Sequence, residues 1–168
     1  AGFCPRQPDN AGRNGLMASS SIMAQFHAPA DMADGSVSIP ATLERFMGID
    51  FGKKRVGIAV GNRISRHATP CRSAVAQGDA RLHAIADLVR EWEPQALILG
   101  IPYHPDGAEH TNTRAATAFG RQLASRCRLP VYGVDERYST TAALELGASD
   151  ADAAAACIIL EQFLNALP

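Results

Sequence analysis

Apolar runs of two kinds along the chain predict five strands. They are expected at residues 43–50, 55–62, 67–75, 96–100 and 131–134. The first is a short hydrophobic strand, and the second, after a Phe-Gly-Lys-Lys turn, alternates large apolar with small residues, which is typical of an antiparallel hairpin. The last two are continuously apolar, as in parallel strands buried on both faces. Pro70 places the third near a sheet edge, because proline cannot donate to a ladder.

Helical spacing of apolar residues predicts four helices between and after these strands. They are expected at residues 79–92, 111–127, 141–146 and 149–164, the first of them capped by Asp79. With the short helix at 141–146 grouped with the final one, the order β-β-β-α-β-α-β-α predicts an α/β domain with a mixed five-stranded sheet flanked by helices. In such sheets, ligands bind beyond the carboxyl ends of the parallel strands.

Residues 1–42 differ from the rest of the chain. They carry Gly, Pro, Ser, Asn and Met with little periodicity, and their large apolar residues are isolated. They also lack the basic and continuously apolar regions of a signal peptide. We therefore expect a disordered or non-native N-terminal extension at 1–42, followed by one domain at 43–168.

Composition narrows the class of protein. The 168 residues include 16 basic and 17 acidic ones, so nucleic-acid contacts must come from local basic clusters. The four cysteines form no C-x-x-C pair, which argues against a zinc site or a disulfide framework and suits a reducing cytoplasm. No apolar run approaches the roughly 20 residues needed to cross a membrane. We expect a cytoplasmic protein without a membrane partner.

Three carboxylates are candidates for a metal site. Asp50 and Glu136 each come at the end of a predicted strand, and Asp152 shares a helical face with the apolar residues of the last helix. Carboxylates gathered at one sheet edge repel one another unless a cation lies between them. Mg²⁺ or Mn²⁺ suits such hard oxygen ligands, and two ions would support phosphodiester hydrolysis.

Simpler interpretations of these residues remain open from spacing alone. Asp50 could initiate a turn as an Asx residue before Gly52. Glu136 could form a surface ion pair, and Asp152 could complete a capping box with Ser149.

The basic triplet Lys53-Lys54-Arg55 has two interpretations as well. It could be a solvated hairpin tip, or it could hold the phosphates that flank a scissile bond. We favour the phosphate contact, because glycines at 52, 57 and 61 would let a nucleic-acid backbone approach closely.

Four segments resemble motifs of one known family. Residues 48–60, Gly-Ile-Asp-Phe-Gly-Lys-Lys-Arg-Val-Gly-Ile-Ala-Val, resemble the opening motif of the YqgF family of pre-16S rRNA nucleases, relatives of the Holliday junction resolvases. Residues 99–107 resemble its central strand-loop motif, residues 134–140 its D-E-R-x-[ST]-T motif, and residues 152–160 its closing D-x-x-A-A-x-x-I-L helix. The motifs stand in family order and cover residues 45–164.

The resemblance implies an RNase H-like fold and a cytoplasmic, divalent-metal nuclease that matures the 5′ end of 16S rRNA. It implies an acidic triad of Asp50, Glu136 and Asp152. Arg137 of the D-E-R motif joins the basic triplet as a nucleic-acid contact. The implied partners are pre-16S rRNA and the pre-30S ribosomal particle, and we expect a monomer or weak dimer.

Other functions are compatible with parts of the pattern. The relation of this family to the Holliday junction resolvases favours resolution of DNA junctions, which normally requires a symmetric dimer. The D-x-G hairpin also occurs in ATP-binding phosphotransferases, but those need a duplicated domain that this length cannot hold. A non-catalytic RNA-binding module is a further alternative. The chain departs from the family at residues 146–150, where the family usually carries a longer segment with glycine and lysine.

Overall fold

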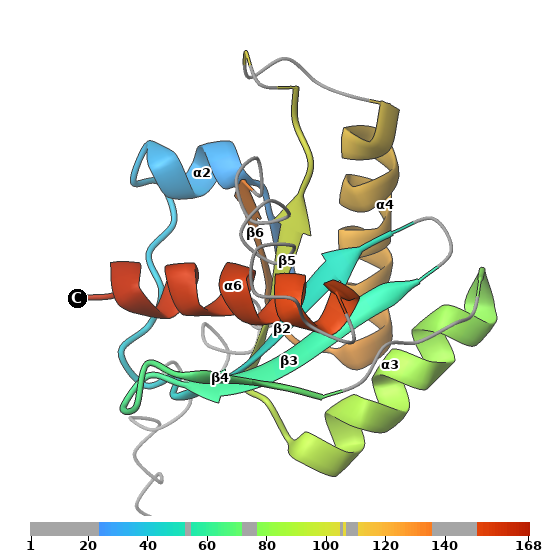
Figure 1. Cartoon of the computed structure of the whole chain (residues 1–168). Helices are drawn as coiled ribbons and strands as arrows, with labels where there is room; N and C mark the ends of the chain where they lie inside the picture. The colour runs from blue at the N-terminus through green and yellow to red at the C-terminus, as the bar shows by residue number, and fades with distance from the viewer. Residues whose placement is uncertain (1–23, 53–54, 72–76, 105, 107–110, 136–150) are drawn as a thin grey trace, which may run out of the picture.

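The computed structural model describes residues 24–52, 55–71, 77–104, 106, 111–135 and 151–168. They form one six-stranded sheet with helices on both faces (Figure 1). The strands are β1 (Phe26–His27), β2 (Arg45–Phe51), β3 (Val56–Asn62), β4 (Ala68–Pro70), β5 (Ala96–Ile101) and β6 (Val131–Asp135). The helices are α2 (Pro29–Ala33), α3 (Asp79–Trp92), α4 (Thr111–Cys127) and α6 (Ala151–Ala166).

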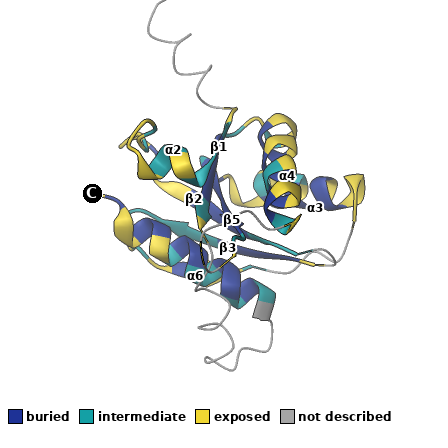
Figure 2. Ribbon diagram, turned by 90° about the horizontal axis from the view of Figure 1, so that it is seen from above, coloured by how far each residue is buried: buried dark blue, intermediate teal, exposed yellow. Residues whose placement is uncertain are grey.

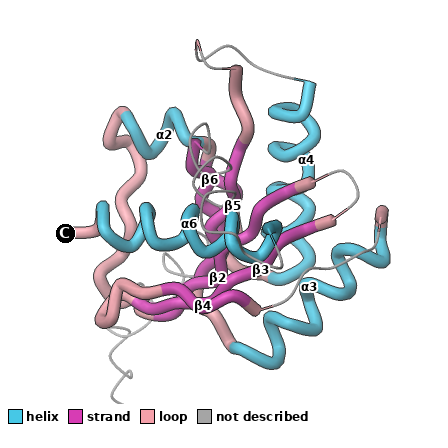
Figure 3. The backbone as a smooth tube through the Cα atoms, viewed as in Figure 1, coloured by secondary structure: helices cyan, strands magenta, loops and turns pink. Residues whose placement is uncertain are grey.

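Strand β2 lies inside the sheet and determines its mixed character. The strand order is β1-β6-β5-β2-β3-β4, and Figure 3 shows the strands from β6 to β4 in this order. Strand β2 is antiparallel to β3 and parallel to β5, and β5 is parallel to β6. An antiparallel β2-β3-β4 unit followed by parallel crossovers is the RNase H-like arrangement that the resemblance implies. The mixed sheet is confirmed, but it has six strands rather than the expected five, because β1 is added at its edge. Each predicted strand has a counterpart, although β4 covers only 68–70 of the expected 67–75, and residues 72–75 lie outside the described part. The helix expected at 141–146 lies outside the described residues.

The two faces of the sheet bury separate apolar layers, because successive strand residues point to opposite sides. Met47 and Ile49 pack with residues of α3 and α4, whereas Phe46 packs with residues of α6. Helices α3 and α4 cover one face and α6 covers the other (Figure 2). Ile85 and Leu123 are fully buried in the first layer, and each contributes roughly 1.5–3 kcal/mol through removal from water.

The segment before residue 43 differs from the expected disordered extension. Its residues 26–27 form β1, which pairs in parallel with Val131 and Tyr132 of β6. The ring of Phe26 packs so closely on α4 that a Cβ atom on Gly120 would lie 2.6 Å from it. The ordered domain therefore begins well before Leu43, and residues 1–23 lie outside the described part. A two-residue strand has no periodicity that a sequence pattern can reveal.

His27 is a buried histidine at the contact between β1 and β6. Its side chain is 7% exposed and stacks on Tyr132 with ring centroids 5.0 Å apart, and its Nε2 has no hydrogen-bond partner among the described residues. Burial lowers the pKa of His27 below its ordinary 6.5, and nearby Asp31 opposes this shift more weakly. His27 therefore binds a proton at a lower pH in the folded protein than in the unfolded chain, where its pKa is near 6.5.

We expect the free energy of unfolding to fall as the pH drops below about 6.5, because protons then bind preferentially to the unfolded chain. His27→Phe keeps a stacking ring without a titrating group and should flatten this part of the profile. Urea unfolding at a series of pH values measures it. The control is His83→Gln, which alters an exposed histidine on α3. An equal pH dependence in His27→Phe and the unsubstituted protein would contradict the prediction.

Candidate active site

Asp50 lies one residue before the end of β2, at the edge where the parallel strands end. Its neighbours in the sheet are Gly57 of β3 and Gly100 of β5. Asp50 shares a face with Gly48, whose absent Cβ would meet Leu160 of α6. The carboxylate of Asp50 is therefore directed to the α6 side of the sheet, and the residue is half-buried.

The first turn of α6 rests directly on the main chain of β3 at Gly57. A Cβ atom on Gly57 would lie 1.8 Å from the carbonyl oxygen of Asp152 and 2.9 Å from the amide nitrogen of Ala153. No other amino acid fits at that distance. Because Gly57 is the cross-strand partner of Asp50, this contact brings Asp152 beside Asp50. Asp152 is half-buried, and its place in the first turn suits the positive end of the helix dipole.

Small residues on both elements make this close approach possible along α6. A Cβ on Gly48 would lie 2.8 Å from the Cβ of Leu160 and 2.9 Å from the carbonyl oxygen of Ala156. On the helix side, Ala153, Ala155 and Ala156 are buried. Backbone therefore packs against backbone here too, which fixes the height of the middle of α6 above the sheet.

The glycines have a different role from the one expected from the sequence. We expected Gly52, Gly57 and Gly61 to leave room for a nucleic-acid backbone. The protein itself fills all three spaces. A Cβ would meet the carbonyl oxygen of Arg55 at 2.6 Å from Gly52, that of Asp152 at 1.8 Å from Gly57, and that of His67 at 2.7 Å from Gly61. These glycines therefore give no support to a phosphate contact by the basic triplet.

The remaining predicted site residues are only partly described. Glu136, Arg137, Lys53 and Lys54 lie outside the described residues. Arg55 is exposed and directly precedes β3, at the same end of the hairpin as Asp50. Across the sheet, Gly100 pairs with Asp50 on one side and Val134 on the other. Glu136 follows Val134 by two positions in the sequence.

Behind Asp50, a stack that the sequence did not reveal supports the end of β2. Phe51 packs on Phe119 of α4 with ring centroids 4.9 Å apart. The guanidinium of Arg81 lies 5.3 Å from the Phe51 ring, and this arginine is only 5% exposed, which lowers its pKa. A desolvated cation–π contact of this kind contributes about 2 kcal/mol. The stack holds Phe51, and hence the neighbouring Asp50, from the opposite face of the sheet.

The donor set at this edge fits a hard divalent cation. Asp50 and Asp152 offer carboxylate oxygens on adjoining elements, and both remain partly exposed. Mg²⁺ and Mn²⁺ prefer such oxygens and retain several waters. Within the described ranges, no three His, Cys, Asp or Glu side chains gather into a metal-binding group, so the described part of the site is this pair.

The described cysteines do not form a thiolate site. Cys71, Cys127 and Cys157 are free thiols and half-buried. Burial raises the pKa of Cys127 to about 11, and burial with a smaller contribution from Glu161 does the same for Cys157. A thiol with so high a pKa stays protonated near neutral pH and is a poor metal ligand.

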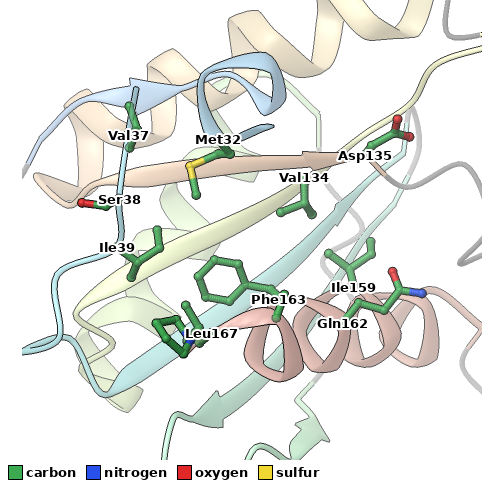
Figure 4. Close-up of a pocket in the computed structure, with 12 residues that line it drawn as sticks. Met32, Val37, Ser38, Ile39, Val134, Asp135, Ile159, Gln162, Phe163 and Leu167 are labelled. Carbon is green, nitrogen blue, oxygen red and sulfur yellow. The ribbon is translucent and has the colours of Figure 1, made fainter. Parts of the chain in front are cut away.

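A separate apolar cavity of about 520 Å³ lies on the α6 side of β6, and Figure 4 shows its lining. Phe163 points into it from α6, Met32 and Ile39 come from the N-terminal segment, and Asp135 stands at its rim. Neither Asp50 nor Asp152 lines this cavity, so it is distinct from the carboxylate site.

No helix in the described ranges is long and apolar enough to cross a membrane.

The sequence profile of the RuvX family, described as Holliday junction resolvase, matches residues 44–166. This chain belongs to the RuvX family. The match confirms the YqgF resemblance, since RuvX and YqgF name the same family. It spans Asp50, Glu136 and Asp152, whereas β1 and α2 precede the matched residues.

Relatives of this RuvX chain carry a consistent name. A Polaromonas protein named "Putative pre-16S rRNA nuclease" is 59% identical over 130 residues, covering 77% of this chain and 94% of its own. An Albidiferax ferrireducens protein of the same name is 56% identical over 140 residues, with 82% and 90% covered. Among solved structures, Thermus thermophilus RuvC in complex with a Holliday junction substrate has a TM-score of 0.49 at 19% identity, with 73% of this chain and 94% of that chain covered.

Proposed function

We propose that this RuvX chain is a metal-dependent endonuclease in which Asp50, Glu136 and Asp152 hold Mg²⁺ or Mn²⁺ and form the catalytic set. One observation carries the proposal: the main chain of Asp152 packs on Gly57, the cross-strand partner of Asp50. Family membership supports the same assignment.

The chemistry follows from the charges at this edge. Two neighbouring carboxylates repel each other, and a divalent cation removes that cost. When bound, such an ion supplies positive charge that polarises a phosphoryl oxygen. The chain's own residues orient the carboxylates through the Gly57 contact and the Phe51 stack. Arg55, exposed beside the site, binds a phosphate next to the scissile bond, and Lys53, Lys54 and Arg137 are proposed to act with it.

The proposed substrate is the 5′ leader of pre-16S rRNA, cut in the cytoplasm during ribosome biogenesis, either free or in a pre-30S particle. Two relatives above 55% identity that carry the name of pre-16S rRNA nuclease support this choice. Both are covered over at least 90% of their own length, so the similarity extends over nearly the whole of each relative.

Purified protein should cleave RNA that spans the 5′ end of 16S rRNA when Mg²⁺ or Mn²⁺ is present, and EDTA should stop the reaction. A control RNA of equal length and shuffled sequence separates recognition from general degradation. Gel analysis of end-labelled RNA gives the cut position. Absence of cleavage with either ion, by protein whose fold is intact, would reject the nuclease proposal and leave an RNA-binding role.

Resolution of DNA junctions is the second candidate, because the matching family profile is described as a Holliday junction resolvase. Symmetric cutting of a four-way junction requires two active sites related by a two-fold axis. The same preparation should therefore be tested on a four-way junction, and its mass measured by light scattering at the assay concentration. Faster cutting of the junction than of the RNA, by a dimer, would favour this candidate.

A further inference from the structure

Helix α4 is strongly basic in a chain whose charges otherwise nearly cancel. Residues 111–128 contain four arginines and no Asp or Glu, whereas the whole chain has 16 basic and 17 acidic residues. All four arginines are exposed: Arg114, Arg121, Arg126 and Arg128. The surface of α4 therefore carries a local excess of positive charge that overall composition conceals.

Two of the arginines share one face of α4, and the other two, Arg126 and Arg128, lie at or just after its C-terminal end. Arg114 and Arg121 are seven residues apart, which is about two turns and about 10.5 Å on one face of an α-helix. The exposed residues beside them are small or polar, namely Ala115, Ala118, Gln122 and Ser125. The only exposed large hydrophobic residues in the described part are Ile64 and Trp92, neither of them on α4. This face lacks the apolar anchors that stabilise protein interfaces.

Neighbouring carboxylates leave much of this charge uncompensated. Asp79 of α3 pairs with Arg126 at 3.1 Å. Asp87, also on α3, pairs instead with Arg90 and His83 of its own helix. Within the described ranges, Arg121 and Arg128 form no ion pair. Exposed guanidinium groups of this kind favour phosphates, which they bind in bidentate geometry.

Two of these arginines, Arg126 and Arg128, line a groove on the protein surface. It has a volume of about 440 Å³ and is lined by Leu82, Gln122, Ser125, Arg126 and Arg128. Four of these five side chains can donate hydrogen bonds, and Leu82 provides an apolar floor. A sugar-phosphate backbone matches such a groove, because it presents acceptor oxygens at its edges and an apolar sugar face between them.

Helix α4 leads away from the proposed active site, with Arg128 just beyond its far end. The hydroxyl of Thr113, in the first turn of α4, donates to the carbonyl oxygen of Pro102, the residue after β5. Because β5 lies beside Asp50, the Arg114 end of α4 lies at the active-site edge. Helix α4 then continues along the face of the sheet opposite α6 for 17 residues, or about 25 Å (Figure 2).

We propose that the exposed face of α4 is a second nucleic-acid contact, which binds backbone phosphates of the substrate beyond the scissile bond. The proposal rests on the proposed nuclease function. It assigns Arg121 and Arg128 to substrate binding and predicts that the substrate extends well past the cut. A substrate of only a few nucleotides would occupy the carboxylate site without reaching these arginines.

The test is Arg121→Gln with Arg128→Gln, measured by fluorescence anisotropy with a 30-nucleotide leader RNA in EDTA. We expect the Kd to rise at least roughly tenfold at low salt. The slope of log K against log salt should fall by about 0.7 for each lost phosphate contact on single-stranded RNA. Affinity for a four-nucleotide RNA should not change. The control is Arg90→Gln, which removes an exposed arginine that is paired with Asp87.

An unchanged Kd and salt slope in the double variant, with its thermal unfolding also unchanged, would overturn the proposal. An equal loss of affinity in Arg90→Gln would do so as well, because it would indicate a general charge effect. Binding is measured without metal and therefore without cleavage. A failure of the nuclease function would appear separately, as intact binding to RNA that is never cut when Mg²⁺ is added.

Discussion

Asp50→Asn should reduce cleavage by at least about a thousandfold, which is the scale of loss when one member of a catalytic group acting as a unit is removed. The substitution preserves the size and shape of the side chain but removes the charge that binds the cation. Initial rates on leader RNA over a series of Mg²⁺ concentrations measure the effect. Far-UV circular dichroism should match that of the unsubstituted protein.

The same variant gives a readout that does not depend on cleavage. Mg²⁺ should raise the Tm of the unsubstituted protein, because a ligand that binds only the folded state stabilises it. Asp50→Asn should lose most of this rise. In EDTA its Tm should equal or exceed that of the unsubstituted protein, since repulsion from Asp152 is relieved. The control is Asp87→Asn on α3, which should keep both cleavage and the Mg²⁺ effect.

Gly57→Ala should disrupt the site without touching a carboxylate. The added Cβ would lie 1.8 Å from the carbonyl oxygen of Asp152, so the first turn of α6 must move away from β3. We expect a loss of stability of about 1–3 kcal/mol or more, as for other overpacked positions. Cleavage should fall about a hundredfold, which is the effect of misplacing a catalytic group by about 1 Å.

Gly48→Ala is the matched control for this prediction. Its Cβ would also press on α6, at 2.8 Å from the Cβ of Leu160, but farther along the helix from Asp152. Both variants should be destabilised in urea, and only Gly57→Ala should lose most of its activity at a temperature where both remain folded. Equal activities of the two folded variants would contradict the role assigned to Gly57.

Local pattern was sufficient to predict most secondary structure. The apolar residues of β2, the alternation of large and small residues in β3 and the apolar runs in β5 and β6 arise from burial inside the sheet, which the sequence displays directly. Finer details of helix ends were less predictable. Asp79 was expected to cap α3, but Gly78 occupies the cap position with φ of 62°, and Asp79 lies in the first turn and pairs with Arg126. That ion pair joins residues 47 positions apart.

The sequence was sufficient to select the carboxylates of the candidate site, but not to predict the contacts that bring them together. Asp50 and Asp152 were selected from strand ends and helical spacing, and their neighbourhood depends on a contact between Gly57 and α6. A glycine in a strand indicates that something approaches closely, but the sequence does not say what. Here the approaching group is a helix of the same chain. The Arg81 stack was missed for the same reason, since Phe51 and Arg81 meet only after the sheet has formed.

The two outer strands of the sheet have a consequence for association between molecules. Strand β1 has two residues and β4 has three, the last of which is Pro70. An edge so short, or ended by a residue without an amide hydrogen, offers little template for a strand of another molecule. Loss of β1 would instead expose the five-residue strand β6. The N-terminal segment therefore covers the edge of β6, and the described parts of both outer strands disfavour association through strand pairing.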